Sequence, residues 1–221
     1  MKKLIIYGVG DFASTLTNYI SSESAFEVVA YSVDDEYLDG KKHFDGKPLY
    51  GLSEIVRKYS YSEHSIMLAI GYSSMRARVS MFENAMKTGL KIENFISKNS
   101  IVHPSVKYGV GNIILPGSIV EPCVSIGDNN IIWSSVNISH DSKIGCHNFI
   151  ATQSLIGGFS KVGDSCFLGF KSTISQNVSL GDETLLGACS LVLKDTLDYG
   201  KYVGVPARLV STHKEKGITI K

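Results

Sequence analysis

The sequence predicts two domains of different classes, a small Rossmann-like α/β domain over residues 1–92 and an all-β, left-handed parallel β-helix over residues 93–221 with a C-terminal tail. The N-terminal part alternates short apolar runs with amphipathic, helix-like segments. From Ile96 onward, an apolar residue instead recurs at every sixth position. An α-helix needs a period near 3.6 residues, so this second pattern excludes helix.

The β-helix prediction depends on the regularity of this six-residue series. Every slot except Tyr108 holds Ile, Val or Leu, and the position four residues later is usually Ser, Asn or Thr, or else Val or Cys. Glycine often follows the aliphatic residue directly, which permits sharp corners. Three such segments make a triangular coil of ~18 residues, and stacked coils bury a continuous aliphatic column. The slots are Ile96, Val102, Tyr108, Ile114, Val120, Ile126, Ile132, Ile138, Ile144, Ile150, Ile156, Val162, Leu168, Ile174, Leu180, Leu186 and Val192.

The N-terminal domain follows from local signals in chain order. A buried strand over 3–7, a tight turn at 8–10, a helix over 11–21 and a strand over 28–33 make a βαβ unit. Three further segments complete a small parallel sheet with its helices: a helix over 53–59, a strand over 66–70 and an amphipathic helix over 74–88.

Composition and charge narrow the class of partner. Lys plus Arg total 22 against 21 for Asp plus Glu, without a long run of either sign, so we expect neither a nucleic-acid nor a membrane partner. The first apolar run is too short for a signal peptide or a membrane span, which predicts a cytoplasmic protein. The four cysteines lack C-x-x-C spacing, which speaks against a zinc framework, and we expect no metal.

Four motifs, in this order along the chain, resemble one known family. They are Tyr7-Gly-Val-Gly-Asp11, Val33-Asp34-Asp35, Ser139-His140-Asp141 inside the repeat, and Gly204-Val-Pro-Ala-Arg208 after it. The chain resembles the sugar acyltransferases of the PglD and NeuD type. The resemblance implies that the N-terminal domain holds a nucleotide-linked sugar and the β-helix holds acetyl-CoA. It also implies a homotrimer with active sites between neighbouring subunits.

His140 is the predicted general base, supported by Asp141. His140 lies two residues after slot Ile138, so it falls at a corner where it can reach a ligand. Acyl transfer needs a base that takes the nucleophile's proton near neutral pH, and histidine suits that task. A carboxylate beside it can fix the tautomer of the imidazole. A solvated corner histidine with an incidental neighbour is the alternative reading, and the resemblance favours catalysis.

The repeat places three residues above His140. Steps of one coil lead from His140 to Gly158, Gln176 and Lys194, about 4.8 Å apart. The N–H group of Gly158 can meet the thioester oxygen, Gln176 lies along the acyl-CoA arm, and Lys194 suits a CoA phosphate. Arg208 is a second candidate for a phosphate. A turn glycine and solvated charges are the alternative readings.

The N-terminal domain carries the predicted nucleotide-sugar contacts. Gly8 and Gly10 form a weak dinucleotide fingerprint that lacks its third glycine, so a redox cofactor is not expected. The resemblance places the turn at Gly8 and Gly10 against the nucleotide, and Asp34 and Asp35 against its base or ribose. An Asp pair also commonly forms a turn. Arg76 follows another strand end at the ligand-binding edge of such sheets.

These residues together predict an acetyl-CoA-dependent N-acetyltransferase acting on a nucleotide-linked amino sugar for surface glycan biosynthesis. One departure leaves the acceptor open, because the family often has a histidine where this chain has Phe149; a sugar hydroxyl is the alternative acceptor. The outward-facing Trp133 fits an interface, the cleft or plain surface packing. Two rivals differ in class: a non-catalytic β-helix scaffold, and a zinc carbonic anhydrase, whose spacing His103, His140 and His147 do not match.

Overall fold

The computed structural model describes residues 2–220 and divides into two compact units. One unit comprises Met1–Gly71 with Ser80–Asn94, and the other comprises Tyr72–Val79 with Phe95–Lys221. The segment 72–79, which the sequence analysis placed in the N-terminal domain, therefore belongs with the repeat. Between residues 2 and 220, no helix combines the length and the apolar character that crossing a bilayer requires.

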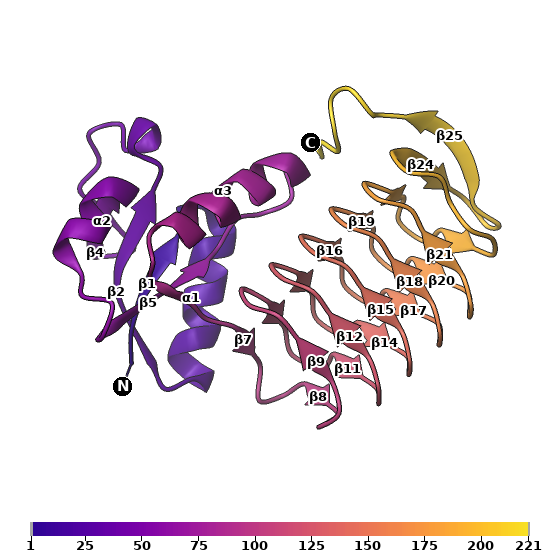
Figure 1. Cartoon of the computed structure of the whole chain (residues 1–221), viewed down its shortest axis with the longest axis horizontal. Helices are drawn as coiled ribbons and strands as arrows, with labels where there is room; N and C mark the ends of the chain where they lie inside the picture. The colour runs from indigo at the N-terminus through magenta and orange to yellow at the C-terminus, as the bar shows by residue number, and fades with distance from the viewer. Residues whose placement is uncertain (1, 221) are drawn as a thin grey trace. The chain divides into compact units, whose positions relative to one another are not determined.

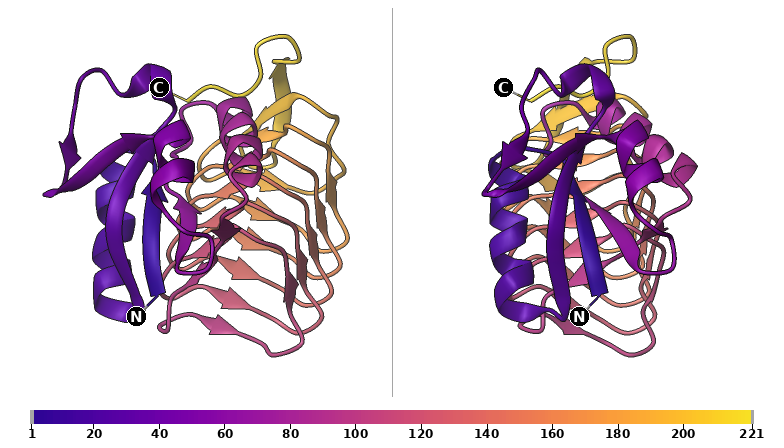
Figure 2. Two further views of the ribbon diagram at one scale, coloured as in Figure 1. Left: turned by 60° about the vertical axis from the view of Figure 1, so that its left-hand side comes forward. Right: turned by 90° about the vertical axis from the view of Figure 1, so that its left-hand side faces the viewer.

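The first unit is an α/β sheet of strand order β3-β4-β2-β1-β5-β6, in which β3 and β4 form an antiparallel hairpin and the other pairs are parallel. Figure 2 shows helix α1 running alongside its central strands. Its strands are β1 (Lys2–Tyr7), β2 (Phe26–Val33), β3 (His43–Phe44), β4 (Lys47–Gly51), β5 (His64–Leu68) and β6 (Lys91–Ile92). The helices are α1 (Asp11–Glu23), the 3-10 turn η1 (Asp35–Tyr37), α2 (Leu52–Lys58) and α3 (Met75–Lys87), whose first turn lies in the second unit.

Burial explains why these segments form these elements. Residues 4–7 of β1 are fully buried, as expected for a central parallel strand covered on both faces. Helix α1 buries Ala13, Leu16 and Ile20, which share one face at helical spacing. It ends where Ser24 donates its N–H group and its hydroxyl to the carbonyl of Ile20.

The second unit is a β-helix of two-residue strands stacked coil upon coil (Figure 1). The covered face contains β7 (Phe95–Ile96), β10 (Ile113–Ile114), β13 (Ile131–Ile132), β16 (Phe149–Ile150), β19 (Phe167–Leu168) and β22 (Leu185–Leu186). The apolar face contains β8 (Ile101–Val102), β11 (Ile119–Val120), β14 (Asn137–Ile138), β17 (Leu155–Ile156), β20 (Thr173–Ile174) and β23 (Leu191–Val192). The lysine face contains β9 (Lys107–Tyr108), β12 (Ser125–Ile126), β15 (Lys143–Ile144), β18 (Lys161–Val162) and β21 (Ser179–Leu180).

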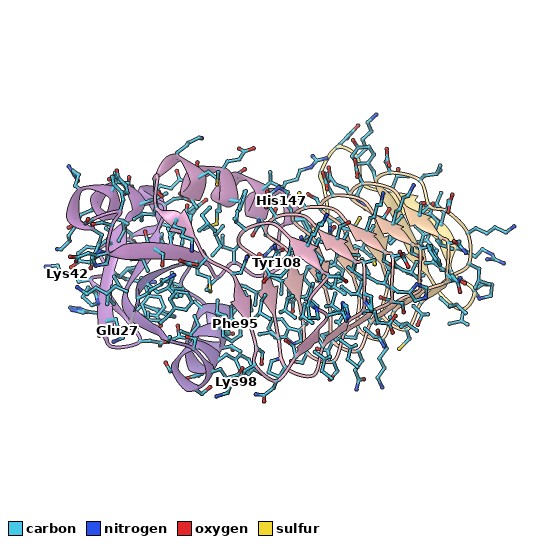
Figure 3. All side chains as sticks on the ribbon, turned by 60° about the horizontal axis from the view of Figure 1, so that its bottom comes forward. Glu27, Lys42, Phe95, Lys98, Tyr108 and His147 are labelled. Atoms are coloured by element: carbon cyan, nitrogen blue, oxygen red, sulfur yellow. The ribbon has the colours of Figure 1, made fainter. Side chains whose placement is uncertain are left out.

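The register of the coils is the one that the repeat predicts. Ile138 pairs with Ile156, which pairs with Ile174, which pairs with Val192. The slot residues from Ile114 to Val192 form one buried column inside the prism, against which Ile96 and Val102 of the first coil pack. Tyr108, the aromatic slot residue of that coil, stays exposed (Figure 3). Small polar residues behind the column satisfy the backbone at the corners; the Ser142 hydroxyl, for example, donates to the Gly157 carbonyl at 3.0 Å. The predicted fold class is confirmed.

The outward residues of the three faces differ in chemistry. On the covered face, Phe149 is 3% and Phe167 8% exposed, because Tyr72 packs its ring against both. On the apolar face, Ile101 and Leu155 remain 67% and 38% exposed. The lysine face presents Lys107, Lys143 and Lys161 to solvent.

The C-terminal part closes the prism and fixes segment 72–79 to it. Strand β24 (Gly200–Val203) pairs with β22 and with β25 (Arg208–Thr212), and the loop between β24 and β25 contains a cis Val205–Pro206 bond. The tail then returns to segment 72–79, where the N–H group of Met75 donates to the carbonyl of Ile218 at 3.1 Å. The buried Arg78 donates from Nη2 to the carbonyl of Asn129 at 2.7 Å.

Candidate active site

His140 and Asp141 form a hydrogen-bonded pair at the corner between the apolar and lysine faces. Both follow β14, and Asp141 has a φ of 59°, which turns the chain toward β15. Nδ1 of His140 lies 3.0 Å from Oδ2 of Asp141, and the two side chains are 47% and 43% exposed. This bond places the proton of a neutral imidazole on Nδ1, so Nε2 carries the basic lone pair.

Glu121 anchors this corner from the coil below and was missed by the sequence analysis. Its Oε2 accepts the backbone N–H group of His140 at 2.8 Å, while the N–H group of Asp141 donates to the carbonyl of Pro122 at 3.1 Å. The spacing of the coils could have predicted this role, because Glu121 lies one coil below Ser139. Counting one coil down from Ser139, the neighbour of His140, identifies Glu121, whereas the same count from His140 itself gives Pro122.

Gly158 lies directly against the imidazole. A Cβ atom at this position would lie 3.0 Å from both Cε1 and Nε2 of His140, so glycine is what lets the backbone and the imidazole lie this close; we call the Gly158 position beside the basic nitrogen the notch. The preceding Gly157 has a different reason to be glycine, since its Cβ would lie 2.6 Å from the backbone nitrogen of Gln176. The third neighbour of the imidazole is Phe159, whose ring centroid lies 5.1 Å away at 88°; it too was missed.

The upper part of the predicted column ends in a cationic pocket. The register places Gln176 one coil above Gly158, and Lys194 one coil above Gln176. Lys194 and Arg208 line one cavity of about 230 Å³, together with Asp195, Tyr202, Pro206 and three apolar residues. The structure thus brings together the two residues that were predicted separately as phosphate ligands.

In the first unit, three of the predicted nucleotide contacts line one pocket. Gly8, Gly10 and Asp34 border a cavity of about 360 Å³ at the carboxyl ends of β1, β2 and β5. Gly8 has a φ of 136°, and a Cβ there would overlap the carbonyl oxygen of Ala69. Only glycine therefore allows this close approach of two backbones.

Asp34 also borders a second, more polar cavity of about 240 Å³, lined in addition by Asp35, Asn84 and Lys87. Oδ1 of Asp34 accepts hydrogen bonds from the hydroxyl of Tyr7 and from Nδ2 of Asn84, the latter at 3.2 Å. Burial, and then the neighbouring Asp34, raise the pKa of Tyr7, so its hydroxyl stays protonated and donates. Tyr7 and Asn84 orient this carboxylate, and the sequence analysis missed both roles.

Asp35 and Arg76 are engaged in other contacts. Oδ1 of Asp35 accepts the backbone N–H group of Ser53 at 3.3 Å, at the start of α2. Arg76 lies in the second unit, where Nε and Nη2 bond the carboxylate of Glu183 and both Nη atoms donate to carbonyls of the C-terminal tail. These contacts stabilise the fold, and the nucleotide roles of Asp35 and Arg76 stay predictions.

Phe149 and Trp133 have packing partners on the covered face. Phe149 stacks on Phe167 at 5.5 Å and lies 5.8 Å from the ring of Trp133. The phenylalanine at position 149 is therefore part of an aromatic ladder under Tyr72. Its departure from the family pattern has a structural reason in this chain.

The histidines considered for a zinc site have other partners. Nδ1 of His103 lies 2.8 Å from the Ser105 hydroxyl, and Nδ1 of His147 lies 3.0 Å from Asn129. Within residues 2–220, no three or more His, Cys, Asp or Glu side chains gather in a way that could hold a metal ion.

Residues 3–81 match the family model of the PglD N-terminal domain. The acetyltransferase domain of PglB from Neisseria gonorrhoeae is 20% identical, with a TM-score of 0.82 over 95% of this chain and 99% of that chain. PerB from Caulobacter crescentus, solved with CoA and GDP-perosamine, is 24% identical, with a TM-score of 0.83 over 96% of this chain and 98% of that chain. WeeI from Acinetobacter baumannii is 19% identical, with a TM-score of 0.78 over 95% and 100%.

A comparison with curated proteins found no match. The family match and the structural matches agree with the motifs from which the resemblance was inferred. The resemblance to the PglD type is confirmed to this extent: residues 3–81 match the PglD N-terminal domain, and the chain as a whole has the fold of the PglB acetyltransferase domain and PerB.

Proposed function

We propose that this protein transfers the acetyl group of acetyl-CoA to the amino group of a nucleotide-linked sugar. The observation that carries the proposal is the arrangement at His140: a carboxylate on Nδ1, a notch beside Nε2, and a column leading from the notch to a cationic pocket. The sugar acetyltransferases with this fold lend it independent support.

His140 acts as the general base. Nε2 takes a proton from the acceptor amine as the amine nitrogen attacks the thioester carbonyl, and the C–S bond then breaks to release CoA. The imidazolium returns its proton to the departing thiolate, so the reaction leaves the enzyme unchanged. Asp141 stabilises the imidazolium, and the N–H group of Gly158 stabilises the oxyanion of the tetrahedral intermediate.

The column above His140 binds the arm of CoA. Gly158, Gln176 and Lys194 rise in steps of one coil, about 4.8 Å each, so the column spans roughly the length of a pantetheine arm. Lys194 and Arg208 supply two positive charges in one cavity, which suits a CoA phosphate.

The N-terminal domain binds the nucleotide part of the acceptor. The turn at Gly8 and Gly10 precedes α1, whose N-terminus favours a negatively charged group such as a diphosphate. Tyr7 and Asn84 both bond Oδ1 of Asp34, and Oδ2 suits donors of a base or ribose. The complex of PerB with GDP-perosamine favours an amino sugar over a sugar hydroxyl as the acceptor.

We also infer that the protein assembles as a homotrimer through its apolar face. Ile101, Ile119 and Leu155 stand outward on successive or nearby coils and stay 67%, 37% and 38% exposed. Ile101 and Ile119 are adjacent in the strand stack, and Leu155 follows after Asn137. Exposed apolar side chains gathered on one face in this way mark an interaction site. Light scattering on the purified protein measures the assembly, and a monomeric mass would contradict the inference.

A thiol-release assay tests the proposed function. Acetyl-CoA is offered with a panel of UDP-, GDP- and dTDP-linked amino sugars and with matched sugars that carry a hydroxyl in place of the amine. We expect thiol release with at least one amino sugar. Release only with the hydroxyl sugars would instead establish O-acetylation. If the protein bound neither CoA nor any nucleotide sugar, the non-catalytic scaffold would be the remaining hypothesis.

A further inference from the structure

Phe159 occupies a corner whose backbone conformation does not suit it. Its φ is 60°, in the left-handed region where a bulky apolar side chain is strained. The neighbouring corners of the β-helix have the same conformation and carry mostly small, polar or charged side chains. From position 123 to 189 these are Cys123, Asn129, Ser135, Asp141, His147, Gln153, Ser165, Lys171, Asn177, Glu183 and Cys189.

Packing does not explain this phenylalanine within the chain. Phe159 is 49% exposed, so it buries little apolar surface in return for the strain. Asn177, one coil above, has a φ of 61° and a side chain that tolerates it. Strained residues of this kind concentrate at functional sites, where another requirement holds them in place.

The contact that Phe159 makes is with the proposed base. Its N–H group donates to the carbonyl of His140 at 3.1 Å, which fixes the backbone of one coil on the other. Its ring then meets the imidazole at 5.1 Å and 88°, an edge-to-face geometry. The imidazole is therefore held by Asp141 through Nδ1 and by Phe159 through the ring, with Gly158 beside Nε2.

We propose that Phe159 is a positioning residue, which holds the imidazole of His140 in the rotamer that directs Nε2 toward the notch at Gly158. This inference rests on the proposed function, because it assigns Phe159 a role through the base of that reaction. A single hydrogen bond to Asp141 leaves the half-exposed imidazole able to rotate. The phenyl ring removes that freedom and covers one side of the imidazole against water.

The central test replaces Phe159 by the residue that suits its backbone. Phe159→Asn should lower kcat about 10-fold while changing the KM for acetyl-CoA less than about 2-fold, because the base is misplaced and the CoA column is intact. The melting temperature should stay the same or rise, since asparagine relieves the strain. Phe159→Tyr keeps the ring and should retain most of the wild-type kcat.

Two controls separate positioning from other roles. Lys171→Asn relieves the backbone strain at a corner on another edge of the prism, where φ is a similar 54°. This variant should leave kcat unchanged. In a His140→Ala background, Phe159→Asn should cause no further loss of turnover, since its effect passes through the imidazole. An additive loss, a falling melting temperature or a changed oligomeric state would overturn the proposal in favour of a structural or interface role.

One readout does not depend on catalysis. The imidazole proton resonances of His140 should carry a ring-current shift from Phe159 that disappears in Phe159→Asn and persists in Phe159→Tyr. If the wild-type protein shows this shift but releases no thiol with any acceptor, the contact stands and the proposed function fails. If Phe159→Asn does not move the resonances, the positioning role fails whatever the enzyme's activity.

Discussion

Two corners of the β-helix use carboxylates for different purposes. At the corner between the lysine and covered faces, each aspartate accepts a backbone N–H group from the coil below, at 2.6 to 2.9 Å. We call this the aspartate corner, formed by Asp128, Asp164, Asp182 and Asp198. At the corner between the apolar and lysine faces, Asp141 bonds an imidazole instead.

The difference shows how a repeat leaves room for chemistry. Backbone N–H groups at a corner need an acceptor, and in the aspartate corner the side chains are used for that purpose. At the His140 corner Glu121 accepts the backbone N–H group of His140, which leaves the carboxylate of Asp141 for the imidazole. A carboxylate at a corner can thus support catalysis when another residue accepts the backbone N–H group of that corner.

The largest expected effect of a single change is on His140. His140→Ala removes the base and should lower turnover by about 10²-fold or more, measured by thiol release at saturating acetyl-CoA. Because the imidazole is half-exposed and outside the aliphatic column, the melting temperature should hardly move. Turnover within a few-fold of wild type would contradict the assignment of His140 as the base. The carboxylate of Asp141 would then have no catalytic role that distinguishes it from those of the aspartate corner.

A smaller effect distinguishes two adjacent glycines. Gly158→Ala places a Cβ 3.0 Å from Nε2 of His140 and should lower kcat about 10-fold at nearly unchanged stability. Gly157→Ala places a Cβ 2.6 Å from the backbone nitrogen of Gln176 and should instead lower the melting temperature. Paired kinetics and thermal unfolding measure the contrast. The opposite result, a stability loss at 158, would mean that Gly158 serves only the turn.

The periodic part of the molecule could be predicted closely because one physical rule governs it. Each aliphatic slot must face the core and each coil must pair with the next, so the position of Gly158 above His140 follows from counting. That Lys194 and Arg208 share one pocket was harder to predict from the sequence, since it depends on how the chain folds back through β24 and β25.

The missed residues are those whose role depends on where a side chain points. Glu121 and Phe159 act on His140 through directions that the six-residue pattern does not specify. Tyr7 was assigned to the core, and its hydroxyl reaches Asp34 at the end of a neighbouring strand. The sequence analysis placed the whole amphipathic helix over 74–88 in the N-terminal domain, whereas Arg76 and Arg78 bond its first turn to the β-helix.

The smallest expected effect tests the aspartate corner itself. Oδ1 of Asp164 accepts the backbone N–H group of Cys146 at 2.6 Å, so Asp164→Ala leaves that donor to water. Because the corner is solvent-accessible, we expect a loss of about 1 kcal/mol in the free energy of unfolding, measured by urea denaturation. Turnover should stay within about 2-fold of wild type, as expected when a hydrogen bond outside the site changes.

Asp164→Asn is the matched control, because its amide oxygen can still accept the N–H group of Cys146 and should restore most of the stability. Asp141→Asn offers the reverse comparison on the other corner, where the charge supports the imidazolium and its loss should lower kcat without a comparable loss of stability. If Asp164→Ala lowered kcat as strongly as Asp141→Asn, the β-helix would transmit strain between its corners. The separation of structural from functional carboxylates would then fail.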